Sequence, residues 1–168
     1  VDTDFDGLDD QTEIEEAGTD PFLADTDGDG LFDGEDRSAR VQINGEIETV
    51  ELDPLSADTD GDGVDDRREL GSYDASANAY AVRSDPTTVD TDGDGIDDGT
   101  ELDGWTATLL TTHEDAQTFQ RALVNESLSP EEYVTERTVT SDPLTEHSDA
   151  DGLNDSRERE LGTDPSAV

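Results

Sequence analysis

The sequence predicts a small α+β protein that is largely irregular: metal-stabilised repeats of acidic loops with short helical turns, one β-hairpin insertion and one small α/β insertion. The chain of 168 residues has few large apolar side chains, a formal net charge of −39 and no cysteine. Apolar burial on this scale does not offset conformational entropy and charge repulsion, so composition alone is typical of a disordered chain. Because disulfides are excluded, bound metal is the remaining means of stabilising so small a core.

The charged residues are unusual in kind as well as in number. All nine basic residues are arginine, and aspartate far outnumbers glutamate. This composition is similar to that of proteins from extreme halophiles. So acidic a surface repels nucleic acid and anionic membranes, and we expect neither as a partner. The sequence has no apolar run of membrane-spanning length and no signal peptide; since it begins at Val1, we expect a processed product or a fragment.

An acidic segment recurs five times, with the full form Asp-Thr-Asp-Gly-Asp-Gly. We call the copies loops one to five and number the positions of each from its first residue; they begin at Asp2, Asp25, Asp58, Asp90 and His147. Position 7 is always apolar: Leu8, Leu31, Val64, Ile96 and Leu153. Position 9 is always aspartate: Asp10, Asp33, Asp66, Asp98 and Asp155. Position 12 is always an acid: Glu13, Asp36, Glu69, Glu101 and Glu158.

An Asp-Pro pair precedes each loop after the first by five residues, at Asp20, Asp53, Asp85 and Asp142, and a fifth pair follows at Asp164. The repeating unit is therefore an acidic loop, a short helical turn and an Asp-Pro turn, with insertions of variable length. Proline has a fixed φ and suits such a turn.

This spacing predicts calcium sites. Calcium binds six to eight oxygens, and carboxylates at positions 1, 3 and 5, a carbonyl at position 7 and an acid at position 12 supply them around a turn that glycine permits. The candidate ligands at positions 1, 3 and 5 are Asp2, Asp4, Asp6, Asp25, Asp27, Asp29, Asp58, Asp60, Asp62, Asp90, Asp92, Asp94, His147, Asp149 and Asp151, joined by the residues at positions 7, 9 and 12. Magnesium needs a more rigid octahedral shell and zinc needs His or Cys, so we expect about five to six Ca²⁺ ions.

Loop five departs from the pattern because its first position is His147, which is a poor calcium ligand; Glu146 or a water molecule is the expected substitute. Two alternatives to calcium loops of this type are a solvated acidic surface and paired EF-hands. Acidic residues scattered by chance would not be accompanied by glycine and an apolar residue at the same positions of every loop. An EF-hand places its core residue at position 8 rather than 7 and needs longer flanking helices.

The phrase Asp-Thr-Asp-Gly-Asp-Gly, followed by an apolar residue and later by Gly-Thr-Asp-Pro, resembles the thrombospondin type 3 repeats of extracellular proteins. The resemblance covers the five loops and their Asp-Pro linkers. It implies calcium-stabilised modules with little regular secondary structure.

Residues 90–146, with Gly104-Trp105-Thr106 and Ser129-Pro130-Glu131-Glu132-Tyr133, are similar to the calcium-binding region of protective-antigen-type binary toxin components. That resemblance implies two ions sharing loop four. The first would be bound by Asp90, Asp92, Asp94, the Ile96 carbonyl and Glu101, and the second by Asp92, Asp94, Glu101, the carbonyls of Ser129 and Glu132 and the Glu146 carboxylate. The chain lacks the toxins' basic cleavage site and pore-forming domains.

The segments between the loops have predictable structure. Residues 41–50 alternate around Asn44-Gly45 and predict a β-hairpin with a type I′ turn. We expect a short strand or hairpin over 73–83, strands over 105–110 and 137–140, a helix over 114–125 and a helix start at Ser129. The predicted main core comprises Trp105, Leu110, Phe119, Leu123, Tyr133 and Val139.

Two domains are expected: residues 1–89, with calcium repeats and the hairpin insertion, and residues 90–168, a protective-antigen-like module ending in loop five. We expect a non-enzymatic extracellular or cell-surface structural or adhesive module of a halophile, such as a filament or virion component. Its partners would be other subunits or surface proteins, including calcium-bridged copies of itself. Two alternatives remain: a calcium-dependent docking module of a toxin-like protein, and an accessory domain of a secreted hydrolase.

Overall fold

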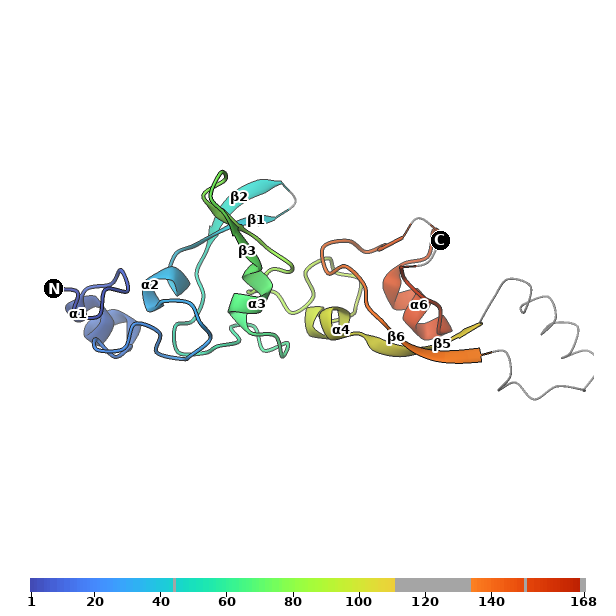
Figure 1. Ribbon diagram of the computed structural model, residues 1–168, viewed down its shortest axis with the longest axis horizontal. Helices are drawn as coiled ribbons and strands as arrows, with labels where there is room; N and C mark the ends of the chain where they lie inside the picture. Colours follow the sequence, from blue (N-terminus) through green and yellow to red (C-terminus); the bar gives the residue numbers. More distant parts are fainter. Residues whose placement is uncertain (44, 111–133, 150, 167–168) are drawn as a thin grey trace, which may run out of the picture. The chain divides into compact units, whose positions relative to one another are not determined.

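A computed structural model describes residues 1–43, 45–110, 134–149 and 151–166 (Figure 1). The chain forms two compact units, one of Val1–Thr91 with Asp97–Gly99 and the other of Asp92–Ile96 with Thr100–Val168. The residues of loop four are divided between them, and the domain boundary expected at residue 90 stays a prediction. No helix within the described ranges is long and apolar enough to cross a membrane.

A short helix follows every loop and begins at position 9, which confirms the predicted helical turns. These helices are α1 (Asp10–Thr12), α2 (Asp33–Asp36), α3 (Asp66–Leu70), α4 (Asp98–Asp103) and α6 (Asp155–Leu161). A π-helical turn, η1 (Glu13–Ala17), continues α1 and ends at Gly18, whose φ of 81° is left-handed. The helix start has a local cause in loops one and five: at position 8, the side chains of Asp9 and Asn154 accept hydrogen bonds from N–H groups of the first turn.

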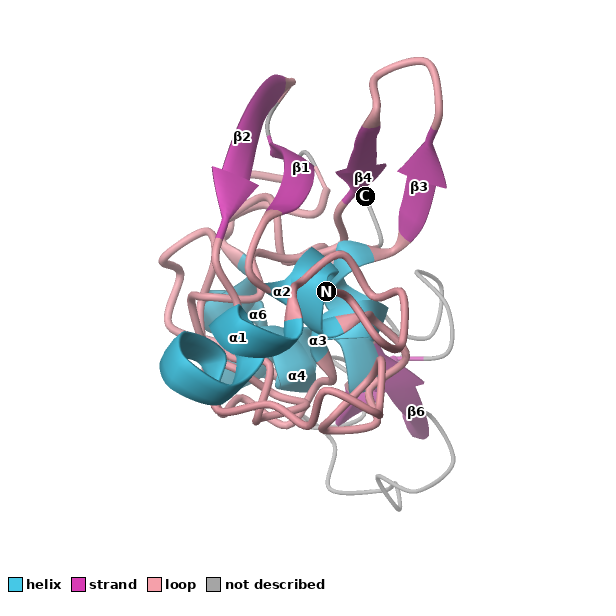
Figure 2. Ribbon diagram, turned by 90° about the vertical axis from the view of Figure 1, so that its left-hand side faces the viewer, coloured by secondary structure: helices cyan, strands magenta, loops and turns pink. Residues whose placement is uncertain are grey.

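The first unit contains a four-stranded mixed sheet made of two hairpins that lie side by side (Figure 2). Strands β1 (Ala39–Ile43) and β2 (Glu46–Val50) form the hairpin expected around Gly45, whose φ is 83°. Strands β3 (Ser72–Asp74) and β4 (Ala79–Ala81) form a hairpin in the segment where the sequence predicts a short strand or hairpin. β1 pairs in parallel with β4, so hairpins inserted after different loops are joined in the order β2-β1-β4-β3.

The apolar core of the first unit lies where the repeats meet this sheet. Leu31 and Val64, both at position 7, are 1% exposed. They are accompanied by Leu70 at the end of α3 and by Val41 and Ala79 of the sheet, which are fully buried. Position 7 therefore contributes an apolar side chain to the core while its carbonyl remains available to the loop. The core predicted in the α/β insertion lies partly outside the described residues, and it stays a prediction.

The second unit contains an antiparallel pair, β5 (Trp105–Leu110) and β6 (Val134–Val139), in which Trp105 is opposite Val139. The predicted strand over 105–110 is confirmed, and the returning strand begins three residues before its expected start at Arg137. Val139 is buried, and the guanidinium of Arg159 lies 5.5 Å from the centre of the Trp105 ring. The helices expected over 114–125 and from Ser129, with Phe119, Leu123 and Tyr133, lie outside the described residues, as does the Leu110 side chain.

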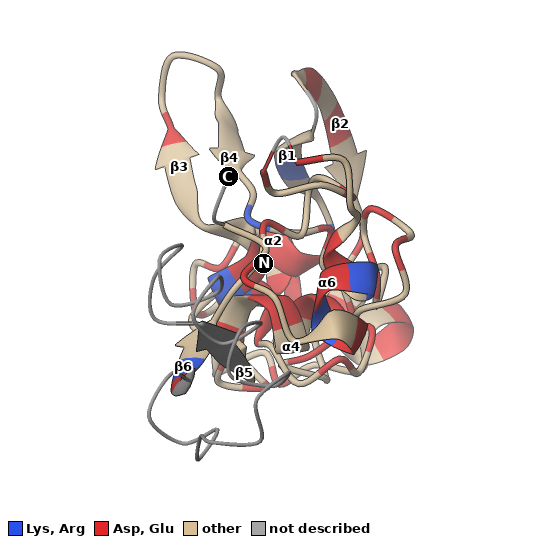
Figure 3. Ribbon diagram, turned by 90° about the vertical axis from the view of Figure 1, so that its right-hand side faces the viewer, with Lys and Arg blue, Asp and Glu red and all other residues tan. Residues whose placement is uncertain are grey.

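Acidic residues follow the loops and the short helices, while basic residues occur at few places (Figure 3). The repeats therefore concentrate negative charge along the segments that contain the candidate ligands.

Candidate metal centres

Each loop is folded by its own aspartates, which accept hydrogen bonds from backbone N–H groups a few residues ahead. In loop three, Asp58 accepts from Gly61 and Gly63 at 2.7 and 3.0 Å. Asp60 then accepts from the N–H of Asp62 at 3.1 Å, and Asp62 accepts from the N–H of Val64 at 2.7 Å. Position 6 has a φ of 95–103° in all five loops, a conformation that only glycine adopts readily. These bonds turn the carboxylates of positions 1, 3 and 5 toward one point.

The resulting clusters match the predicted ligand sets in the first three loops. One carboxylate oxygen from each member lies within 4.8 Å of the others in the sets Asp2, Asp4 and Asp6; Asp25, Asp27 and Asp29; and Asp58, Asp60 and Asp62. Such a spacing is that of oxygens around a single hard cation.

Several carboxylate oxygens at positions 3 and 12 are buried and accept no hydrogen bond from any described residue. They are both oxygens of Asp4 and Asp36, Oδ2 of Asp60 and Asp149, and Oε2 of Glu13, Glu69 and Glu158. A buried charged oxygen without a partner is costly, and a bound cation removes that cost. Positions 3 and 12 are two of the expected ligand positions, and Oδ2 of Asp6, at position 5, is orphaned in the same way.

A hydroxyl residue orients the acid at position 12, and the sequence analysis missed it. Thr19, Ser84, Ser141 and Thr163, each directly before an Asp-Pro pair, donate to Oε1 of Glu13, Glu69, Glu101 and Glu158 at 2.6–3.4 Å. In loops one, three and five, Oε2 is buried and accepts no hydrogen bond from any described residue. In loop two the residue before the Asp-Pro pair is Leu52, which has no hydroxyl. The acid at position 12 is the shorter Asp36, and neither of its oxygens accepts a hydrogen bond from any described residue.

A second missed contact joins the start of each loop to its position 9. In loop three the N–H and hydroxyl of Thr59 donate to the two oxygens of Asp66, at 2.8 and 2.7 Å, and the hydroxyl also accepts from the N–H of Asp53 at 2.9 Å. The same three bonds recur in loops two, four and five. The position-9 aspartate thus holds the loop closed and ties it to the preceding Asp-Pro turn. The sequence contains a signal for this contact, because position 2 carries a hydroxyl in every loop.

The Asp-Pro pairs form turns that position the next loop. The carbonyl of Asp53 accepts from the N–H of Ser56 at 2.9 Å, and its side chain accepts from the N–H of Leu55 at 3.1 Å. Equivalent bonds occur at Asp20, Asp85 and Asp142. An aspartate that closes its own turn before proline fixes the direction in which each loop begins.

Loop four has the same local hydrogen bonds as loop three, and these do not test the two-ion arrangement that the toxin resemblance implies. Asp94 donates to Asp92 at 3.0 Å through its N–H, and its own side chain accepts from the N–H of Ile96 at 2.8 Å. Glu101 is fully buried, whereas Glu146 is exposed. Ser129 and Glu132, the other expected ligands of the second ion, lie outside the described residues, so this second ion stays a prediction.

Loop five keeps the scaffold but has a different group at position 1. The Nδ1 atom of His147 makes a short contact with the carbonyl oxygen of Leu153, the atom expected at position 7 of the calcium shell. This hydrogen bond raises the pKa of the exposed imidazole above its usual value. The ring therefore competes with a cation for that carbonyl.

Burial raises the pKa of acids at positions 12 and 9, and neighbouring carboxylates raise it further. The pKa rises to about 9 for Glu69, about 8 for Asp36 and about 7 for Glu13. For Asp66 and Asp98 it rises to about 6, because bonds from threonine oppose the effect of burial. Groups that resist ionisation without a cation will ionise when one binds, so calcium binding at these loops will release protons.

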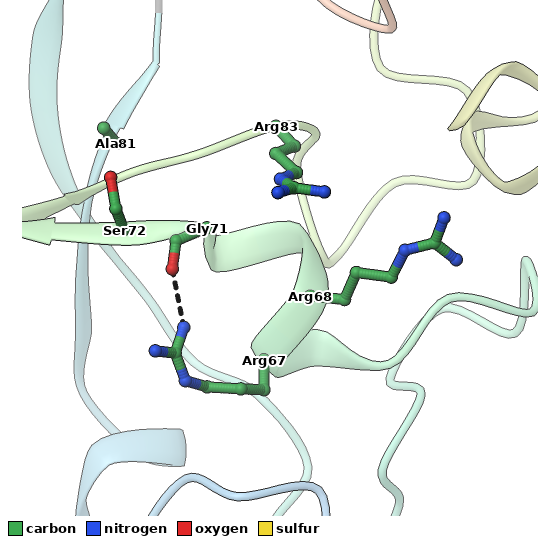
Figure 4. A pocket seen from close by; sticks show the side chains of 6 residues that line it. All are labelled: Arg67, Arg68, Gly71, Ser72, Ala81 and Arg83. Atoms are coloured by element: carbon green, nitrogen blue, oxygen red, sulfur yellow. Dashed lines mark hydrogen bonds between the residues drawn. The ribbon is translucent and has the colours of Figure 1, made fainter. Parts of the chain in front are cut away.

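Basic side chains gather beside a cavity of about 330 Å³ lined by Arg67, Arg68, Gly71, Ser72, Ala81 and Arg83 (Figure 4). The guanidinium of Arg67 points away from that of Arg68 and donates to the carbonyl of Gly71 at 2.6 Å. It also lies 5.5 Å from the centre of the Tyr80 ring. Arg67 therefore packs α3 against the sheet.

Comparison with known families supports the assignment of the loops. Residues 2–24 and 148–166 match the sequence model of the bacterial TSP3 repeat. The first segment contains loop one and the Asp-Pro turn at Asp20; the second contains most of loop five and the turn at Asp164. No curated protein and no solved structure matches the chain significantly. TSP3-type repeats and the acidic clusters are together consistent with a calcium-binding module.

Proposed function

We propose that this chain is a structural or adhesive module of an extracellular or cell-surface protein, made rigid by about five to six calcium ions in its loops. The observation that supports this most is the set of buried, orphaned oxygens at positions 3 and 12. They recur in phase with the repeat, and solvated surface acids have no reason to be buried in this way.

Calcium fits these groups better than other common cations. The donors are carboxylate and carbonyl oxygens, which favour a hard cation, and the three-carboxylate clusters do not require an octahedral shell of fixed geometry. Sulfur ligands are absent from the chain, and His147 is the one imidazole at a loop. This donor set disfavours zinc.

The role of the ion is to make folding possible. Carboxylates about 4 Å apart repel one another by roughly 1 kcal/mol per pair even with water-like screening, and by more in a buried site. A bound calcium ion attracts all of these carboxylates at once. The free energy of calcium binding therefore contributes directly to the free energy of folding. The acids then act as ligands rather than as catalysts, and the expected partners are other subunits or surface proteins. The high acidity agrees with an environment of high salt.

The test is calcium-dependent folding, measured by circular dichroism and thermal unfolding. Potassium chloride at about 1 M, where the Debye length is about 3 Å, suppresses non-specific counter-ion effects. We expect EGTA to abolish the cooperative transition, calcium to restore it, and magnesium at equal concentration to restore it much less.

A matched pair of variants localises the effect. Asp60→Asn removes a charge whose Oδ2 is orphaned and buried, whereas Asp65→Asn alters an exposed neighbour at position 8. The first should weaken calcium-dependent stabilisation and the second should not. An unchanged spectrum and melting temperature after complete calcium removal would refute the proposal.

A further inference from the structure

A cavity of about 160 Å³ lies in the first unit, where the β3–β4 hairpin meets the start of β1 (Figure 2). It contains none of the loop positions that are candidate calcium ligands. Its aromatic and polar lining residues are Glu35, Ser38, Arg40, Tyr73, Asn78 and Tyr80. We call it the tyrosine pocket.

Two tyrosine rings on neighbouring strands line the tyrosine pocket. Tyr73 of β3 is paired with Tyr80 of β4, and their ring centres are 5.2 Å apart at an interplanar angle of 72°. Tyr80 is 9% exposed; the Arg67 guanidinium lies 5.5 Å from its ring centre, and its hydroxyl donates to Oε1 of Glu35 at 3.3 Å. Tyr73 is 53% exposed. A fixed, buried ring therefore supports an aromatic ring that is open to solvent.

The polar groups of the pocket are held in place and keep hydrogen-bonding capacity. The Tyr73 hydroxyl donates to Oδ1 of Asn78 at 2.7 Å, which leaves the Asn78 amide nitrogen as a donor. Asn78 has a φ of 53°, a left-handed conformation that asparagine tolerates better than most residues. Among the described residues, neither this nitrogen nor the Arg40 guanidinium donates to any acceptor. Oε2 of Glu35 accepts from the N–H of Phe32 at 3.3 Å, which orients a carboxylate with further lone pairs.

We propose that the tyrosine pocket binds one neutral sugar unit of a surface polysaccharide. The C–H face of a pyranose ring is apolar and packs on an aromatic ring, while its hydroxyls need both donors and acceptors at the rim. Pockets for drug-sized ligands measure about 300–1,000 Å³, so a cavity of about 160 Å³ suits a single ring. The net charge of −39 repels sulfated and uronic acid polymers, which favours a neutral sugar.

An apolar peptide side chain fits this pocket less well than a sugar does. Ala39 is the one aliphatic residue in the lining. An apolar occupant would cover the donors of Asn78 and Arg40 without pairing them, and buried polar groups without partners are costly. Sugar hydroxyls accept from such donors and donate to the Glu35 carboxylate.

The tyrosine pocket is attached to loop two, which links sugar binding to calcium. Glu35 lies in α2 between Asp33 and Asp36, the acids at positions 9 and 12 of that loop. Calcium that orders the loop therefore also positions the acceptor of the pocket. The inference goes beyond the proposed function, in which the partners are proteins, because it adds a carbohydrate ligand to the adhesive form of the module.

Saturation-transfer difference NMR, which detects weak binding, tests the inference on the calcium-loaded full chain. The probes are the methyl glycosides of glucose, galactose and mannose, with N-acetylarginine amide as a cation that Tyr73 and Glu35 would also attract. Tyr73→Ala removes the exposed ring, and Asn78→Gly removes the amide while allowing the left-handed backbone. Ile47→Ala is the matched control, since Ile47 is 45% exposed on β2 of the same sheet but outside the pocket.

We expect signal transfer to at least one glycoside with the wild type and Ile47→Ala, and affinity about tenfold lower with Tyr73→Ala and Asn78→Gly, each of which loses one contact. The calcium-dependent melting transition of the same samples should be alike in all four proteins. Transfer to no glycoside, transfer to N-acetylarginine amide alone, or equal affinity in the wild type and Tyr73→Ala overturns the inference, and an intact melting transition then leaves the proposed function standing. A wild type without a calcium-dependent transition defeats the proposed function itself.

Discussion

Loops three and five are built by the same local bonds but are buried to different extents. In both, a hydroxyl at position 2 donates to the aspartate at position 9, and a hydroxyl before Asp-Pro donates to the acid at position 12. Val64 at position 7 of loop three is 1% exposed, whereas Leu153 of loop five is half-buried. Asp62 accepts from the helix of the next repeat, whereas Asp151 is exposed. The bonds that shape the loop are therefore local, while the contact that Asp62 makes comes from the neighbouring repeat. The acids at position 12, Glu69 and Glu158, are buried in both loops.

The largest expected effect is on the pH dependence of calcium binding. The pKa of Glu69 in the folded protein, about 9, exceeds its ordinary value of 4.5, so the folded state binds more protons between these values. Stability from this group is complete below about pH 4.5 and is lost as pH rises through about 9. Because calcium displaces the proton that Glu69 holds, calcium affinity should rise over this range, and calorimetric titration at several pH values measures the increase. A calcium affinity that did not increase with pH would contradict this assignment.

Replacing the acid at position 12 should have the second-largest effect. It should lower the unfolding free energy more in loop three than in loop five. Glu69→Gln takes a charged ligand away from a buried calcium ion, whose charge is then poorly compensated, and should lower the unfolding free energy of the calcium-loaded protein by about 3–5 kcal/mol. Glu158→Gln, in the shallower loop five, should cost less. Urea unfolding at saturating calcium measures both variants. Equal losses would show that burial by the next repeat does not set the strength of the site.

Deleting the hydroxyl at position 2 should affect both loops similarly. Thr59→Val removes the hydroxyl bonds to Asp66 and from Asp53, and Ser148→Ala removes those to Asp155 and from Asp142. Each should cost about 1–3 kcal/mol, because buried polar partners lose a hydrogen bond. The same urea measurement applies, and Thr49→Val, at an exposed hydroxyl on β2, is the control. A loss confined to Thr59→Val would mean that this contact is not a local one.

The smallest expected effect comes from restoring the acid at position 1 of loop five. His147→Asp replaces a ring that contacts the Leu153 carbonyl with a carboxylate. It should strengthen calcium binding by about 1 kcal/mol, which is roughly fivefold. Calorimetric titration measures the gain, and Thr138→Asp, an exposed change on β6, controls for added charge. Unchanged affinity would show that position 1 is not a ligand in this loop.

The features that sequence predicted well are those with local causes. The spacing of Asp and Gly predicted the acidic clusters of loops one to three, and Asn44-Gly45 predicted the β1–β2 hairpin. The short helices also have local causes, since each starts at a fixed distance after the loop glycine. In such cases the residues that make the bonds lie within about seven positions of one another.

The features that sequence reasoning missed depend on contacts between distant segments. The parallel pairing of Val41 with Tyr80 joins two hairpins that no local pattern relates. The bond from the N–H of Arg67 to Asp29, at 3.2 Å, spans two repeats in the same way. Hydroxyls at position 2 were visible in the sequence, but without a fold they had no assigned partner.

In loops two and three the chain leaves and returns to a single point after the acid at position 12. The carbonyl of Asp36 accepts from the N–H of Leu52, and that of Glu69 accepts from the N–H of Arg83, both at 2.7 Å. The two hairpins of the sheet are attached at these two closing hydrogen bonds, and no loop ligand lies within either hairpin. The hairpin tips are therefore suitable insertion points for foreign peptides, tags or whole folded segments. Such an insertion would leave the ligands of the loops unchanged.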